Sequence, residues 1–265
     1  MNTNFLQNKA NILRKELFQK FAIIKQGHPG SIFSIIDFLT VLYYGKLIKT
    51  NSPNRDKIIV SKGHATSALY PILRDFKILK KKEWDNWGSK KKSILKIFGN
   101  IDIPGIDMTT GSLGHGLGVA AGMAIANKKI NIYTIISEGE FYEGSTWESL
   151  LFIKGRSIKN VKIIVDVNNL IILGKTDNCL KINPLKPKIE KLGFKCSEVN
   201  GHNFKDLEKK TKELKLGKIQ CLLINSIKGK GFKIMENNPK WHYWNNLSKN
   251  DEIKCLSEIN KKIKV

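Results

Sequence analysis

The chain has 265 residues, 41% of them hydrophobic and 26% charged, which is enough apolar material for one large folded domain and argues against intrinsic disorder. Its four cysteines form neither a CxxC pair nor a Cys/His cluster, so we expect no structural zinc, no disulfide scaffold and a reducing, cytoplasmic location. The N-terminal residues lack the apolar core of a secretory signal, and the most apolar early stretch, residues 32–45, is shorter than a membrane span, which excludes secreted and membrane-spanning proteins.

The formal net charge of +23 raises the question of a nucleic-acid partner. Only four of the 46 basic residues are Arg, the side chain whose planar fork reads bases and phosphates. The remaining 42 are Lys, spread along the chain with one dense run at 77–96. We therefore interpret most of this charge as solvated surface, although a basic patch would also attract sugar phosphates or a diphosphate.

In chain order, apolar periodicity and turn residues predict an alternation of helices and strands. The predicted helices span residues 6–25, 32–44, 64–82, 117–127, 145–154 and 251–265, and residues 83–105 are irregular. The predicted strands span residues 57–61, 131–137, 161–167 and 221–226, with a weaker strand at 194–199. Because the strands are almost continuously apolar, we predict an α/β fold with a parallel sheet flanked by helices on both faces. One domain, residues 1–265, includes the helical tail 251–265 that closes it.

Polar and Gly-rich motifs follow four of the predicted strands, where ligands bind in parallel α/β sheets. These motifs are KGH, SEGE, NNL and KGKG. All five histidines stand beside Gly or Trp at predicted element ends, where an imidazole can hold a phosphate or move a proton near pH 7. The Gly-rich run 111–118 opens a helix and could cradle a phosphate, but it matches no nucleotide-binding fingerprint.

Glu138 and Asn168 are thirty residues apart, which is one strand–helix–strand step. They are therefore expected at adjacent strand ends, where two side-chain oxygens and a nearby carbonyl would suit Mg²⁺. A purely structural interpretation, with Glu138 as a helix N-terminal acid and Asn168 as a turn residue, stays open on spacing alone.

Seven motifs together resemble the thiamine-diphosphate-binding N-terminal domain of transketolases in order and spacing. They are KQGHPGS, IVSKGHA, TTGSLGHGLGVAAGMA, SEGEFYEGSTWE, IVDVNNL, NSIKGKGF and MENNPKWH, and they cover about residues 10–243. The resemblance implies the thiamine-diphosphate-binding fold, with thiamine diphosphate and Mg²⁺ or another divalent cation as cofactors.

The resemblance also implies roles for individual residues. Glu138, Asn168 and the Leu170 carbonyl would be metal ligands, and His28 and His242 would line the substrate channel as catalytic residues. The residues implied in cofactor binding are Ser31, His64, Gly111, Ser112, Leu113, Gly139, Asn168 and Lys228, while Glu143 matches an acid at the family's subunit contact.

The implied activity is transfer of a two-carbon ketol unit from a ketose phosphate to an aldose phosphate, as in the pentose phosphate pathway. Full transketolases are more than twice as long and carry a second domain whose Glu activates the cofactor. The chain therefore resembles the N-terminal subunit of a split transketolase. It is expected to need a C-terminal partner subunit, in an assembly with two copies of each chain, and to bind neither membranes nor nucleic acid.

Two further departures from the family pattern concern the site. The family's Gly-Asp-Gly is Ser137-Glu138-Gly139 here, and Asn100 stands where the family has a substrate-contacting His. These departures favour one alternative, a decayed, non-catalytic basic binding protein. A second alternative is another thiamine-diphosphate enzyme on the same fold, such as a dehydrogenase α subunit or a deoxyxylulose-phosphate synthase.

Overall fold

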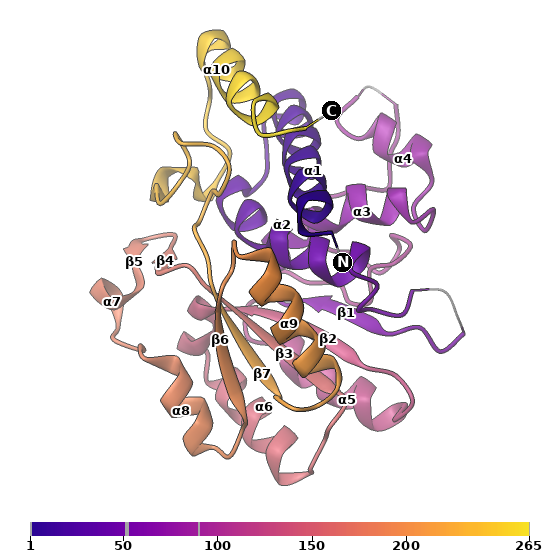
Figure 1. Ribbon diagram of the computed structural model, residues 1–265, viewed down its shortest axis with the longest axis vertical. Helices are drawn as coiled ribbons and strands as arrows, with labels where there is room; N and C mark the ends of the chain where they lie inside the picture. The colour runs from indigo at the N-terminus through magenta and orange to yellow at the C-terminus, as the bar shows by residue number, and fades with distance from the viewer. Residues whose placement is uncertain (1, 51–52, 90, 265) are drawn as a thin grey trace.

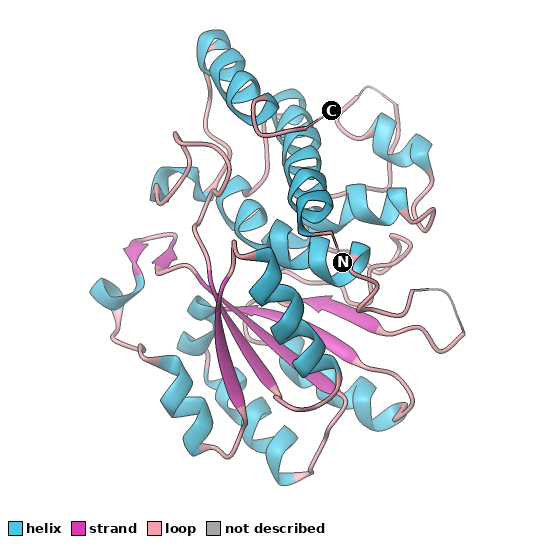
Figure 2. Ribbon diagram, in the orientation of Figure 1, coloured by secondary structure: helices cyan, strands magenta, loops and turns pink. Residues whose placement is uncertain are grey.

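A parallel five-stranded sheet forms the centre of the computed structural model, which describes residues 2–50, 53–89 and 91–264 (Figure 2). Met1 and Val265, which end the predicted domain and tail, and Lys90 of the Lys-rich run lie outside the described residues. The strand order is β1-β2-β3-β7-β6. The strands are β1 (Lys57–Val60), β2 (Ile132–Ser137), β3 (Val161–Val167), β6 (Cys196–Asn200) and β7 (Cys221–Asn225). The predicted parallel sheet is confirmed.

Helices cover both faces of this sheet (Figure 1). Successive strand residues point to opposite faces, so in β3 Ile164 enters one core while Ile163 and Val165 enter the other. The first core is covered by α1 (Thr3–Ile24), α2 (Pro29–Tyr44), α3 (Tyr70–Asp75), α9 (Phe204–Lys215) and α10 (Lys249–Asn260). The second is covered by α5 (Gly116–Ala126), α6 (Gly144–Gly155) and α8 (Leu185–Lys191).

The remaining elements are short. They are α4 (Lys81–Asn86), α7 (Thr176–Cys179), the antiparallel pair β4 (Leu170–Ile171) and β5 (Gly174–Lys175), and the 3₁₀ turns η1 (Gly63–Leu69), η2 (Glu138–Tyr142) and η3 (Pro239–His242). The C-terminal helix α10 packs against α1 and ends at Asn260, so the predicted tail helix does not extend over residues 261–264. Among the described helices, none combines the length and the apolar character that crossing a membrane requires.

The prediction of one helix over residues 64–82 is wrong. The chain there forms η1 and then α3, and α4 begins only at Lys81. Pro71 stands in the first turn of α3, where its missing N–H is tolerated, but it could not continue a helix from the preceding turn. After α3, Lys77 adopts a left-handed φ of 58°, which ends the helix.

Helix α2 is buried along nearly its whole length, and its first residues lie at the carboxyl edge of the sheet. Pro29 occupies the start of the helix, where its fixed φ suits the first turn. Inside the helix, Asp37 accepts hydrogen bonds from Arg14 of α1 and from His202 Nδ1, each at 2.7 Å. The Nε2 atom of His202 in turn accepts from the Ile227 N–H at 2.9 Å. This buried chain of contacts ties α1 and α2 to the turn that follows β7.

Candidate active site

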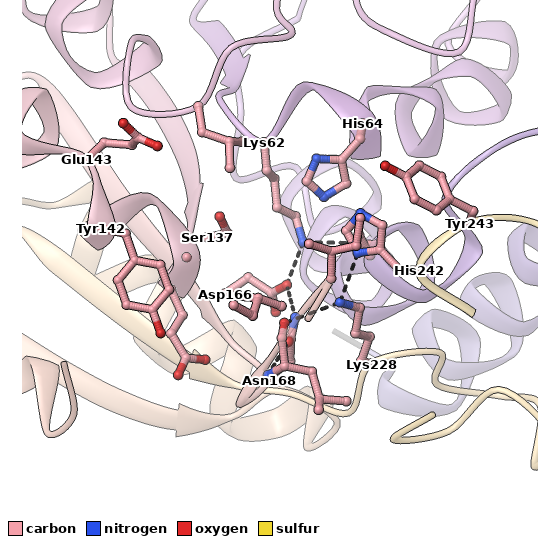
Figure 3. A pocket seen from close by; sticks show the side chains of 17 residues that line it. Lys62, His64, Ser137, Tyr142, Glu143, Asp166, Asn168, Lys228, His242 and Tyr243 are labelled. Carbon is pink, nitrogen blue, oxygen red and sulfur yellow. Dashed lines mark hydrogen bonds and ion pairs between the residues drawn. The ribbon is translucent and has the colours of Figure 1, made fainter. Parts of the chain in front are cut away.

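A cavity of about 310 Å³ lies at the carboxyl ends of the central strands (Figure 3). It is bounded by residues that follow β1, β2, β3 and β7, together with the first turn of α2 and η3. Its lining residues are Ser31, Lys62, His64, Leu113, Ser137, Glu138, Gly139, Tyr142, Glu143, Asp166, Asn168, Leu170, Ile171, Ile172, Lys228, His242 and Tyr243. The cavity therefore forms where ligands bind in parallel α/β sheets.

A buried ion pair lies at the base of the cavity, where the Lys62 ammonium is 2.5 Å from Asp166 Oδ2. Asp166 also accepts from Ser34 at 2.8 Å, from Ser226 at 2.5 Å and from the Asn168 side-chain amide at 3.0 Å. Burial opposes ionisation of Asp166, but the Lys62 ammonium and the hydroxyl donors outweigh it and hold its pKa below the ordinary value. This network orients the Asn168 side chain.

Lys228 contributes a second amine to the cavity. Its Nζ donates to the Leu170 carbonyl at 3.2 Å and lies 3.2 Å from His242 Nδ1. Burial, reinforced by the nearby Lys62 ammonium, lowers the pKa of Lys228 to about 8. An anion beside Lys228 would relieve this cost, so the two amines make the cavity suitable for phosphate groups.

Three imidazoles gather beside the cavity, and Figure 3 labels the two that line it, His64 and His242. The ring centroids of His28, His64 and His242 lie 5.2 to 5.5 Å from one another. Burial, with Lys228 nearby, lowers the pKa of His28 to about 4 and that of His242 to about 3, and burial also lowers the pKa of His64. Neutral imidazoles at pH 7 can donate and accept hydrogen bonds, as contacts with sugar hydroxyls require.

The oxygens of Glu138, Asn168 and Leu170 come from adjacent strand ends, because Ser137 of β2 is in register with Asp166 of β3. Asn168 Oδ1 accepts from the Leu170 N–H at 3.1 Å, and the Leu170 carbonyl accepts from Lys228. The Glu138 carboxylate accepts three protein hydrogen bonds, from Asn169, Thr176 and Asn183.

These oxygens fit a hard divalent cation. Each retains acceptor capacity, since a carboxylate offers about four lone-pair positions and each amide or carbonyl oxygen offers two. Across residues 2–50, 53–89 and 91–264, no three His, Cys, Asp or Glu side chains gather as a metal site. A cation at this edge would therefore depend on amide and carbonyl oxygens beside one carboxylate.

The donors for a diphosphate also fit. The two buried amines of Lys62 and Lys228 face one cavity with His64. In the described structure, the buried Nδ1 of His28 has no hydrogen-bond partner.

A second buried acid, Glu140, supports the loops around the cavity. Its carboxylate accepts from the Ser61 hydroxyl, from the Gly114 N–H at 3.0 Å and from the Ser137 N–H at 2.8 Å. Burial raises the pKa of Glu140 despite these donors. Glu140 thus links the end of β1, the Gly-rich turn and the end of β2.

Most of the residues predicted for the site lie together. Those that line the cavity are Ser31, His64, Leu113, Glu138, Gly139, Asn168, Leu170, Lys228 and His242. His28 lies directly behind His64 and His242 rather than on the cavity wall. Gly111 and Ser112 are exposed and do not line the cavity, although they directly precede Leu113, which does. Glu143 lies on the lining and is exposed in this chain.

Seven residues of the cavity wall were not predicted from the sequence: Lys62, Ser137, Tyr142, Asp166, Ile171, Ile172 and Tyr243. Lys62 belongs to the KGH motif and Asp166 opens the D-x-N motif, so both stood beside residues that were chosen. The sequence did contain a signal for this ion pair. A Lys follows one buried strand closely and an Asp lies near the end of another, and buried charges are usually paired.

Comparison with known proteins gives consistent matches. Residues 6–259 match the family described as "Transketolase, thiamine diphosphate binding domain". The chain is 34% identical over 245 residues to the 6-deoxy-6-sulfo-D-fructose transketolase subunit SqwG of Clostridium sp. (strain MSTE9), covering 87% of this chain and 88% of that protein. It is 32% identical over 267 residues to a subunit of the apulose-4-phosphate transketolase of Actinobacillus succinogenes, covering 96% and 95%.

A solved structure shows the same fold. The transketolase from Campylobacter jejuni superposes with a TM-score of 0.83 at 26% identity, over 98% of this chain and 47% of that one. The chain thus spans nearly the full length of two relatives that are named as subunits and about half of this single-chain transketolase.

Proposed function

Because this chain belongs to the transketolase family through its thiamine-diphosphate-binding domain, we propose that it is the N-terminal subunit of a split transketolase. The chain transfers a two-carbon ketol unit from a ketose phosphate to an aldose phosphate, together with a C-terminal partner subunit. One observation carries the proposal: the adjacent ends of β2 and β3 bring the oxygens of Glu138, Asn168 and Leu170 beside the amines of Lys62 and Lys228.

In the proposed site, Glu138, Asn168 and the Leu170 carbonyl hold Mg²⁺ or another divalent cation. The Gly139 N–H, Ser31, His64 and Lys228 bind thiamine diphosphate, as do Gly111, Ser112 and Leu113 of the Gly-rich turn. Lys62 neutralises Asp166 at the base of the cavity. Bound thiamine diphosphate supplies the carbon nucleophile that takes up and releases the two-carbon unit.

The two catalytic imidazoles act on the sugar. His242 lies on the cavity wall and His28 lies behind it, and both have depressed pKa values. As neutral rings they orient ketose hydroxyls and move protons between those oxygens during bond cleavage and formation. Burial, reinforced by Lys228 3.2 Å from His242 Nδ1, disfavours protonation of this ring and keeps it neutral.

The proposal extends to the surroundings of the chain. Residues 1–265 act as one domain within an assembly of two copies of each polypeptide, acting on pentose-phosphate-type sugars in the cytoplasm. The support for a reducing compartment is chemical, since Cys179, Cys196, Cys221 and Cys255 are all free thiols.

The test is native mass spectrometry of the chain purified from its own cells, followed by assays of the recovered complex. We expect a second polypeptide of similar size, thiamine diphosphate and Mg²⁺, and consumption of a ketose phosphate only when an aldose phosphate is present. Asn168→Ala should remove both the cation and the cofactor from the complex. Consumption of pyruvate instead would assign the chain to a different thiamine-diphosphate enzyme. A chain that carries nucleic acid and no cofactor would refute the proposal.

A further inference from the structure

The segment that follows β3 projects beside the cavity and contains β4, β5 and α7 (Figure 1, left edge). We call residues 169–183 the strap. The strap supplies Leu170, Ile171 and Ile172 to the cavity wall. Its own secondary structure is limited to two strands of two residues and one helical turn. Such short elements do not hold a segment in place, so its position depends on side-chain contacts with the rest of the domain.

The Glu138 side chain makes three of those contacts. Its carboxylate accepts from the Asn169 N–H at 2.8 Å, from the Thr176 hydroxyl at 2.6 Å and from the Asn183 side-chain amide at 2.7 Å. These donors lie at the beginning, the middle and the end of the strap. Glu138 is 2% exposed and Thr176 is 1% exposed, so water does not substitute for either partner.

The length of the Glu138 side chain matters for this arrangement. One oxygen receives both the Thr176 hydroxyl and the Asn183 amide, while the other receives a backbone N–H. An Asp at this position would withdraw the carboxylate by one methylene, on the order of 1.5 Å, which exceeds the tolerance of hydrogen bonds at these distances. The departure from the family's Asp is therefore matched by donors in this chain.

We propose that Glu138 anchors the strap over the cavity and that Thr176 and Asn183 are positioning residues for its carboxylate. The consequence for the site rests on the proposed function. The anchor fixes Leu170, whose carbonyl faces Lys228, and it limits the Glu138 carboxylate to one orientation at the edge where a cation would bind. Glu138, Thr176 and Asn183 then act as one unit.

A second set of contacts gives the competing explanation. The Tyr142 hydroxyl donates to the carbonyl oxygens of Thr176 at 2.8 Å and of Leu180 at 3.2 Å. These bonds do not involve Glu138. If they alone held the strap, changes at Glu138 or at the Thr176 hydroxyl would leave it in place, and Tyr142→Phe would release it.

Hydrogen exchange of the full chain, read by mass spectrometry without added cofactor, separates the two explanations. Thr176→Val removes the hydroxyl at constant shape, Thr176→Ser restores it, and Lys181→Ala changes an exposed strap position as a control. We expect exchange across residues 169–180 to accelerate about tenfold in Thr176→Val, Asn183→Ala and Glu138→Asp, and to stay within about twofold of the parent in Thr176→Ser and Lys181→Ala. Exchange of β2 should not change.

Coupling provides the decisive comparison. In a Glu138→Asp background, adding Thr176→Val should accelerate strap exchange little further, because the shared bond is already lost. Fully additive effects, or unchanged exchange in both Thr176→Val and Glu138→Asp, would overturn the proposal.

Titration of the complex with thiamine diphosphate and MgCl₂ then tests the consequence for the site. Thr176→Val should weaken binding about tenfold and Thr176→Ser should not, with exchange measured on the same samples. Unchanged binding in Thr176→Val would overturn this consequence. If the parent complex binds no thiamine diphosphate, the proposed function fails, whereas the exchange experiment still decides the anchor.

Discussion

The side chains at the base of the cavity place a full ion pair in the interior, with Lys62 and Asp166 each 1% exposed at the side chain. Desolvating two charges is costly, and the pair persists because its remaining hydrogen-bonding capacity is used. Lys62 reaches the Ser31 carbonyl at 3.0 Å, and Asp166 receives Ser34, Ser226 and Asn168. Removing one partner is therefore more damaging than removing both.

Replacing Lys62 by Met tests this pair. The buried Asp166 carboxylate would lose its counter-charge, and we expect a loss of about 3–5 kcal/mol in the free energy of unfolding. The double variant Lys62→Met/Asp166→Asn should recover part of that loss, because no unpaired charge is left inside. Urea denaturation of the three chains measures both quantities, and a single variant as stable as the parent would contradict the role given to the pair.

The imidazoles of His28 and His242 predict how stability depends on pH. Burial depresses their pKa values to about 4 and about 3 in the folded chain, whereas the unfolded chain titrates near 6.5. Below pH 6.5 the unfolded state binds more protons than the folded state, so their contribution is present above pH 6.5 and falls as the pH decreases toward 4. Chemical denaturation at pH 7 and pH 5 should show a smaller loss in His28→Asn/His242→Asn than in the parent. Equal losses would exclude this linkage.

At the residue scale, the sequence predicted the site best where motifs mark the strand ends. The spacing of strand ends suggested Glu138 and Asn168, the family resemblance added Lys228, and all three line the cavity. Lys62 was missed because one Lys among 42 carries no signal of burial. The partners of Glu138 were also missed, since Thr176 and Asn183 are 38 and 45 positions away with no periodic pattern to connect them.

At the scale of elements, the first turn of α2, the turn after β7 and η3 converge at Gly30. A Cβ at Gly30 would lie 2.8 Å from the Trp241 carbonyl oxygen and 3.1 Å from Lys228 Cγ. The Gly30 carbonyl also accepts from the Gly229 N–H at 2.9 Å. This close packing places Lys228 and His242 on the cavity wall. It is possible because Gly30 has no side chain.

The variant Gly30→Ala should separate these elements. We expect a loss of about 1–3 kcal/mol in the free energy of unfolding, because a backbone carbonyl must move. Gly122→Ala in α5 is the matched control: its added Cβ meets nothing within 4 Å, so Ala in a helix interior should stabilise the chain by about 0.5–1 kcal/mol. Thermal unfolding of both variants compares them, and a neutral Gly30→Ala would mean that η3 shifts freely.

Prediction of the elements succeeded where hydrophobic periodicity is strong. Strands β2, β3 and β7 agree within a residue or two with the predicted ranges, since each is a continuous apolar run. The region after β1 was predicted wrongly because its apolar residues have helical spacing, while Pro71 and the left-handed Lys77 interrupt the backbone. Strands β4 and β5 are too short to leave any periodicity in the sequence.

At the scale of the whole molecule, apolar side chains are exposed on the strap beside the cavity. Ile172 is 47% exposed, Leu173 80% and Leu180 60%. Exposed apolar groups gathered at one place are characteristic of interaction sites. In the proposed split enzyme they would contact the partner subunit, since the strap borders the site that both subunits share.

Leu173→Glu tests this surface without disturbing the core. We expect unchanged stability of the isolated chain and at least tenfold weaker binding to the partner subunit, because a charge would be buried in the contact. Leu216→Glu is the control. Leu216 is 70% exposed at the C-terminal cap of α9, near the amino ends of the strands and therefore away from the cavity. Size-exclusion chromatography of the mixed subunits measures the difference. Equal association of both variants with the partner would place the contact elsewhere.

The strand order ends at β6, which among the described strands pairs only with β7. The edge of β6 that faces away from β7 therefore presents backbone N–H and C=O groups to which a strand of another molecule could add. The strand is five residues long and displays the exposed carboxylate of Glu198, with exposed Lys195 directly before it. Charge at the edge of a sheet discourages the docking of a foreign strand. We therefore expect the polar composition of β6 to limit strand addition, and replacement of Glu198 by an apolar residue should promote self-association more than it destabilises the fold.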